Sequence, residues 1–197
     1  MTMAQHWSYN KYDKWKSTDN VIHLMIDTVS KGGNLLINIG PTGEGLFPPE
    51  AVDRLAALGR WMNINREAIV GTRPWKIYGE GPSTVPAPVT DNAAGAPKAA
   101  DVKAAKMIAY TAEDIRFTTK GDTLYAIALG WPANGKLNIT SLAEGASQYP
   151  GPIGTVALLG AQAPVSYQRD GTGLHVDLPA DKPCDSAYVL KISPPAK

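Results

Sequence analysis

Hydrophobic positions in the first third of the chain recur with a helical period. Ile22, Met25, Ile26 and Val29 are spaced as one face of a helix, and a glycine pair at 32–33 can end it. We therefore expect a helix over residues 18–31. Three consecutive residues can cap its start: Ser17, Thr18 and Asp19.

A second apolar stripe begins after Pro48-Pro49, a pair suited to the first turn of a helix. Glu50 lies in that first turn, where a negative charge interacts favourably with the helix dipole. The pattern predicts a helix that ends near residues 63–65. Its stripe consists of Val52, Leu55, Leu58, Gly59 and Met62.

Between these helices, Leu35–Ile39 carries apolar side chains in both directions, which is typical of a parallel strand covered on both faces. Helix, strand and helix in this order form the closing unit of a β/α architecture. At most one further strand is predicted before them, around Trp7–Tyr9. Because Leu35–Ile39 lacks neighbours, we expect another chain to supply the missing strands, or the segment to repack or self-associate.

After about residue 75, short alternating runs separated by Gly, Pro, Asn and Asp replace the helical spacing. About eight strands are expected, and they predict an antiparallel β-sandwich. A hairpin is predicted with its turn at residues 120–122, and a loose Pro- and Ala-rich loop at 82–105. The predicted fold is α+β: a barrel-derived unit over residues 1–75 and a sandwich domain over residues 76–197.

Composition excludes several kinds of partner. With 19 basic and 18 acidic residues and no basic block, the chain has no nucleic-acid footprint. No apolar run reaches the roughly 18 residues of a membrane span, and no signal peptide is recognisable. We therefore expect a cytoplasmic protein, or a secreted or periplasmic one if a natural N-terminal part precedes it. The single cysteine, Cys184, and three widely separated histidines predict no metal site and no cofactor.

Three stretches carry a family resemblance. The run from Val29 to Trp75, with "GGNLLINIGP" followed by "EAIVGTRPW", resembles the end of the catalytic barrel in family 29 glycoside hydrolases, the α-L-fucosidases. "HWSYN" and the following "WKS" are similar to that family's Trp-Gly-Tyr segment and Lys-Ser pair, with Ser8 in place of the glycine. "EDIRFTTKGDTLYAIALGWP" resembles the family's C-terminal sandwich. The resemblance extends from about residue 6 to 192.

The resemblance implies a (β/α)₈-like barrel and retaining hydrolysis of α-L-fucosides by two carboxyl groups about 5–5.5 Å apart. In the family, both carboxyl groups and the histidines that hold fucose precede the Trp-Gly-Tyr segment. No catalytic residue can therefore be assigned here. Trp7 matches the aromatic residue that forms the apolar wall against the sugar, and His6 lies beside it. The implied ligand is a fucosylated glycan or fucoside.

Three hypotheses remain open from the sequence. The chain is a C-terminal portion of an α-L-fucosidase, inactive alone or dependent on a complementing N-terminal barrel chain. Alternatively, it is a carbohydrate-binding or structural sandwich module, whose candidate platform consists of Trp131, Tyr125, Tyr149 and Tyr167. Thirdly, it hydrolyses fucosides unaided, with Glu44 as the first candidate. Spacing identifies no partner for three further acids: Asp13, Asp19 and Asp27.

Overall fold

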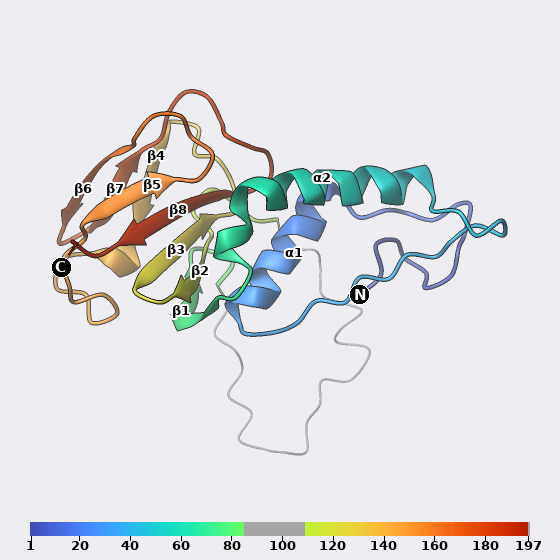
Figure 1. Ribbon diagram of the computed structural model, residues 1–197, viewed down its shortest axis with the longest axis horizontal. Coiled ribbons are helices and arrows are strands. Elements are labelled where there is room, and N and C mark those ends of the chain that lie inside the picture. The colour runs from blue at the N-terminus through green and yellow to red at the C-terminus, as the bar shows by residue number, and fades with distance from the viewer. Residues whose placement is uncertain (85–108, 197) are drawn as a thin grey trace, which may run out of the picture.

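The computed structural model describes residues 1–84 and 109–196 (Figure 1). Most of the predicted loop at 82–105, and most of an alternating run at 105–111, lie outside the described residues.

Both predicted helices are present. Helix α1 spans Thr18–Ser30, and the Ser17 side chain accepts a hydrogen bond from the Asn20 backbone at its start. Helix α2 spans Pro49–Asn65 and continues into a short 3₁₀ helix, η1, over Arg66–Ala68. α1 packs against α2 and against the first two strands of the sandwich.

Two antiparallel sheets confirm the predicted sandwich. The larger has the strand order β1-β2-β3-β8-β5, and the smaller has the order β4-β7-β6. The predicted hairpin joins β2 to β3 with Lys120 opposite Thr123. The strands are β1 Arg73–Glu80, β2 Ile115–Lys120, β3 Thr123–Ala128, β4 Lys136–Ile139, β5 Thr155–Leu158, β6 Ser166–Asp170, β7 Gly173–Asp177 and β8 Tyr188–Ser193.

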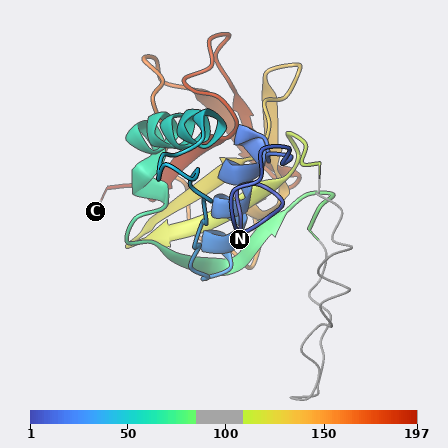
Figure 2. The same ribbon diagram turned by 90° about the vertical axis from the view of Figure 1, so that its right-hand side faces the viewer.

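The five-stranded sheet is the middle layer of three, with the small sheet on one face and the helices on the other (Figures 1 and 2). Strand alternation makes this possible, because successive side chains point to opposite faces. On β3, Leu124 and Ala126 face the small sheet, whereas Tyr125 and Ile127 face the helices. β3 and β8 consequently contribute apolar side chains to both faces, whereas β2 turns the buried polar residues Arg116 and Thr118 toward the helices.

Directed hydrogen bonds fix the helices on this sheet. The indole Nε1 of Trp61 in α2 donates to the Ala187 carbonyl at 2.8 Å, just before β8. Thr118 of β2 donates through its hydroxyl to the Ala68 carbonyl at 2.7 Å. Both contacts are buried, so breaking either leaves an unpaired polar group in the core.

A buried ion pair reinforces the same interface. Arg116 of β2 is 1% exposed, and its Nε lies 2.7 Å from a carboxylate oxygen of Asp27 in α1. The other oxygen of Asp27 binds Lys31 at 2.7 Å. The guanidinium also lies over the rings of Tyr78 and Tyr110.

The predicted strand at Leu35–Ile39 is wrong in this chain. The segment forms one isolated parallel bridge, between Asn38 and Thr2, rather than a strand. Backbone bonds join Asn38 to Met1 and Met3 at 2.8 and 3.0 Å. The predicted cover on both faces is also wrong, since Leu36 is 82% exposed. A single parallel neighbour is too little sheet to form a ladder or to bury the second face.

No strand forms around Trp7–Tyr9, where at most one was expected. Trp7 and Ser8 lie in bends, and the partner of the Asn38 segment is Met1–Met3 instead. Strand β1 begins at Arg73 and pairs with β2. The predicted division of the chain at residue 75 stays a prediction.

Candidate functional site

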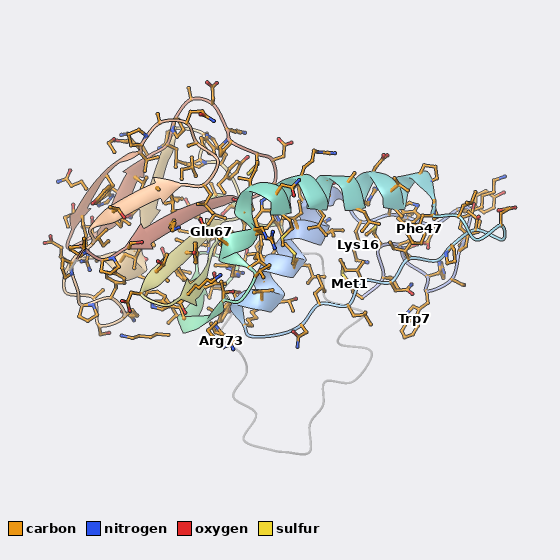
Figure 3. All side chains as sticks on the ribbon, in the orientation of Figure 1. Met1, Trp7, Lys16, Phe47, Glu67 and Arg73 are labelled. Carbon is orange, nitrogen blue, oxygen red and sulfur yellow. The ribbon has the colours of Figure 1, made fainter. Side chains whose placement is uncertain are left out.

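The residues expected to face a sugar lie on an N-terminal loop at the end of the molecule remote from the sandwich (Figure 3). The loop is built around Asp13, whose side chain is only 2% exposed. Its carboxylate accepts backbone hydrogen bonds from Gln5, His6 and Lys14 at 3.0–3.1 Å. It also lies 3.1 Å from Nδ1 of His6. One carboxylate therefore closes the loop.

These contacts lower the pKa of Asp13. Burial opposes ionisation of Asp13, but hydrogen bonds from the His6 backbone and ring and from Gln5 outweigh it and hold the pKa of Asp13 below its usual value. Asp13 is thus an anion whose hydrogen-bonding capacity is committed to the loop.

A second set of contacts holds the loop against the Asn38 segment. The Asn38 side chain donates to the Trp7 carbonyl at 2.8 Å. A Cβ at Gly40 would lie 2.5 Å from the backbone of Ser8 and Tyr9, so only glycine permits this approach. Ser8 itself has no positive φ, and serine in place of the family's glycine is accommodated without backbone strain.

The two predicted site residues are brought together on this loop and presented to solvent. The side chain of Trp7 is 83% exposed and projects from the loop (Figure 3), and the His6 side chain is exposed beside it. An exposed indole offers an apolar face, and the imidazole offers a hydrogen-bonding nitrogen. This pair can contact a ligand through an apolar face and a ring nitrogen, but it contains no carboxyl group.

Large exposed apolar side chains are concentrated in the N-terminal part of the chain. All those described, except Val70 and Tyr167, lie between residues 7 and 52, and Figure 3 shows Trp7 and Phe47 at the end of the molecule remote from the sandwich. The N-terminal set consists of Trp7, Tyr9, Tyr12, Leu36, Leu46, Phe47 and Val52.

The Asn38 segment also presents an open edge. Leu36 and Asn38 form backbone hydrogen bonds with the Met1–Met3 segment, whereas Ile37 and Ile39 make no backbone hydrogen bond to another described residue. Their side chains pack toward α1 and α2, next to Val21 and Ala51. The backbone groups of Ile37 and Ile39 are therefore available to a further parallel strand.

Glu44 does not have the environment of a general acid. It is exposed between Gly43 and Gly45, and hydrogen bonding to the Thr42 side chain lowers its pKa. A general acid needs a raised pKa instead, although an ionised nucleophile does not. Of the described residues lining the hollow beneath His6, only Asp13 carries a carboxylate.

The four aromatic residues proposed as a sandwich platform do not form one. Tyr125 is buried under the helices, Trp131 packs edge-on against Tyr188, and Tyr149 lies beneath the Arg169 guanidinium. Only Tyr167 of the four is exposed, and its hydroxyl donates to the Gly154 carbonyl.

Within residues 1–84 and 109–196, no group of three or more His, Cys, Asp or Glu side chains could hold a metal ion. No helix in those ranges is long and apolar enough to cross a membrane. Cys184 is half-buried and donates to the Ala187 carbonyl, and burial raises the pKa of its thiol. The cellular location stays a prediction.

Two family models match the chain. The α-L-fucosidase model covers residues 1–67, and the model of the α-L-fucosidase C-terminal domain covers residues 109–193. Among solved structures, an α-fucosidase of Thermotoga maritima in complex with fucose superimposes with a TM-score of 0.69 at 26% identity. That match covers 97% of this chain and 38% of the bacterial enzyme. The fold and these matches place the chain among the glycoside hydrolase families.

The chain belongs to the α-L-fucosidase family, glycoside hydrolase family 29. Human tissue α-L-fucosidase is 32% identical over 182 residues, which is 88% of this chain and 31% of the human protein. The enzyme of Branchiostoma floridae is 31% identical over 180 residues, 32% of its length. The chain thus spans about a third of the length of the relatives it matches.

Proposed function

We propose that this chain provides the C-terminal part of an α-L-fucosidase that hydrolyses α-L-fucosides with retention of configuration. The two carboxyl groups of that reaction come from outside these 197 residues, so the chain alone is inactive. Family membership supports the substrate class. The observation that carries the proposal is the composition of the N-terminal loop. The loop presents an exposed indole, Trp7, and an imidazole, His6, but its one carboxylate, Asp13, is occupied by hydrogen bonds from backbone N–H groups.

Trp7 and His6 are proposed as substrate-binding residues in the complete site. Fucose presents an apolar methyl side, and an indole is a large flat surface against which such a group packs. His6 supplies a polar contact beside it. Neither residue is assigned a catalytic role.

The proposed partner is a complementing N-terminal barrel segment. It would add strands to the open edge at Ile37 and Ile39 and cover the exposed Leu36 and Phe47. Self-association through the same surface is the competing arrangement, and it would give a larger native mass without hydrolysis.

The test is complementation. The chain is mixed with the barrel segment that precedes the matched region in α-L-fucosidase relatives, and release of the aryl group from an aryl α-L-fucoside is followed. We expect hydrolysis from the mixture and from neither piece alone. No gain over the separate pieces would contradict the proposal.

The second candidate is a carbohydrate-binding or structural sandwich module without catalysis. It is weakened by the burial of Tyr125 and the packing of Trp131 and Tyr149. Calorimetric titration of the isolated chain with fucosylated oligosaccharides separates the two candidates. Heat that persists in Trp7→Ala would place binding on the sandwich.

A further inference from the structure

The contacts of the three histidines differ in one respect. His6 approaches its partner through Nδ1, which lies 3.1 Å from the Asp13 carboxylate. His23 and His175 use Nε2 instead, toward the Ser186 carbonyl at 2.8 Å and toward Asp170 at 3.1 Å. Because an ionised carboxylate and a carbonyl only accept hydrogen bonds, the nitrogen facing each one must carry the proton. Nε2 of His175 also lies 2.9 Å from the Thr172 hydroxyl, but that hydroxyl donates its proton to Asp170 at 2.6 Å and so acts as an acceptor toward His175.

We propose that Asp13 is a positioning residue that holds neutral His6 in its Nδ1-protonated tautomer, so that Nε2 is left as a hydrogen-bond acceptor for a sugar hydroxyl beside Trp7. The hydroxyl-recognition half of this inference rests on the proposed function, and the tautomer half does not.

The geometry allows few alternatives for the ring. Asp13 is fixed by three backbone N–H donors, so its oxygen cannot turn away from His6 without opening the loop. The amide nitrogen of Asn10 also faces Nδ1, but at 3.5 Å it is the longer contact. An amide donor needs an unprotonated Nδ1, and the anionic acceptor at 3.1 Å outcompetes it.

The tautomer decides which hydroxyl hydrogen bonds the site can make. With Nδ1 protonated, neutral His6 accepts from a ligand through Nε2, whereas the opposite tautomer could only donate there. Sugar hydroxyls can do both, but each bound hydroxyl is oriented by the acceptor or donor that it meets. Asp13 therefore influences the ligand without touching it.

Nitrogen-15 NMR of the isolated, labelled chain at about pH 8, where free imidazoles are neutral, reads each tautomer directly. We expect a protonated Nδ1 in His6 and a protonated Nε2 in both His23 and His175. The other two histidines serve as references within one spectrum. A protonated Nε2 in His6 would overturn the inference, whether or not complementation succeeds.

Asp13→Ala tests the cause, because it removes the acceptor that faces Nδ1 and leaves the Asn10 amide donor as the neighbour of that nitrogen. We expect His6 to shift toward the Nε2-protonated form, while His175 is unchanged. Asp170→Ala is the matched control and should leave His6 unchanged. An Nδ1-protonated His6 that persists in Asp13→Ala would remove Asp13 from this role, and the wild-type spectrum stands even if that variant folds poorly.

The hydroxyl-recognition half of the inference is tested by the kinetics of the complemented enzyme. Asp13→Ala is expected to raise KM for the aryl fucoside severalfold with a smaller effect on kcat, and Asp170→Ala to change neither. Equal kinetics of wild type and Asp13→Ala would overturn the hydroxyl-recognition half of the inference, whereas the tautomer assignment is decided by the NMR spectrum alone.

Discussion

Trp7 is the residue on which sugar binding depends most in this account. Trp7 is 83% exposed. The Asn38 side chain binds its backbone carbonyl, not its ring, so the indole remains accessible to a ligand. Trp7→Ala should raise KM of the complemented enzyme about threefold to tenfold, the effect of losing one aromatic contact. Tyr12→Ala is the control, because it removes an aromatic side chain of similar exposure from the same loop. Equal KM values for the two variants would contradict the assignment.

Gly40 sets how closely the loop approaches the Asn38 segment. In Gly40→Ala the new methyl group would overlap the Ser8 and Tyr9 backbone, and we expect a loss of about 1–3 kcal/mol in the free energy of unfolding. Gly43→Ala has nothing within 4 Å and should be close to wild type. Denaturant unfolding measures both. Equal stability of the two variants would show that the loop does not sit on Gly40.

At the residue scale, the sequence predicted Trp7 and His6 as site residues but gave no role to Asp13, which contacts His6. No partner was predicted from spacing for Asp13, Asp19 or Asp27. Helical spacing could have indicated Lys31, four residues after Asp27, which lies 2.7 Å from it. The structure also pairs the three acids with His6, Ser186 and Arg116, respectively. The last two partners are far away along the chain. His6 is only seven residues from Asp13, but that spacing belongs to no regular element, so periodicity could not reveal it.

At the element scale, the ion pair between α1 and β2 is the clearest determinant of how the helices sit on the sandwich. Asp27→Ala leaves Arg116 buried without its counter-charge, which should cost roughly 3–5 kcal/mol of unfolding free energy. Asp177→Ala, which breaks an exposed pair with Lys136, should change little. Denaturant unfolding of both variants is the measurement, and similar losses would contradict the ranking.

Element prediction succeeded where periodicity was strong. The amphipathic stripes located α1 and α2, and the alternating runs located the strands of the sandwich. The failure at Leu35–Ile39 has a physical cause: an apolar run specifies a strand only when neighbours exist to pair with it. The strands that do have both faces covered are β2, β3 and β8, which lie between the helices and the small sheet.

At the scale of the whole molecule, alkaline pH should lower the stability with which the helices pack on the five-stranded sheet. Burial, with the nearby Glu67 carboxylate, raises the pKa of Tyr125 to about 12. Because the pKa of Tyr125 is higher in the folded than in the unfolded state, the neutral hydroxyl favours the folded state below about pH 10. This contribution to the free energy of unfolding is lost as the pH rises toward about 12. Tyr125→Phe should therefore lose less stability than wild type between pH 10 and 11.5. Unfolding midpoints measure this, with Tyr12→Phe as control; parallel pH slopes for Tyr125→Phe and wild type would contradict it.

The molecule consists of a β-sandwich with its own core and an N-terminal part in which the barrel-derived segments are only partly paired. The sandwich has its own core between two sheets, whereas the N-terminal segments expose Leu36, Leu46 and Phe47 and leave backbone groups unpaired. The sequence predicted this asymmetry because helical and strand periodicities change near residue 75. The sequence could not predict how the unpaired segment would settle against Met1–Met3, which depends on tertiary contacts.

The most direct test is amide hydrogen exchange at Ile37 and Ile39, before and after the complementing barrel segment is added. We predict fast exchange in the isolated chain and protection in the mixture, since a new parallel strand would bond these backbone groups. Protection in the isolated chain as strong as that of the β8 amides would show that the edge is already closed, and would contradict the account.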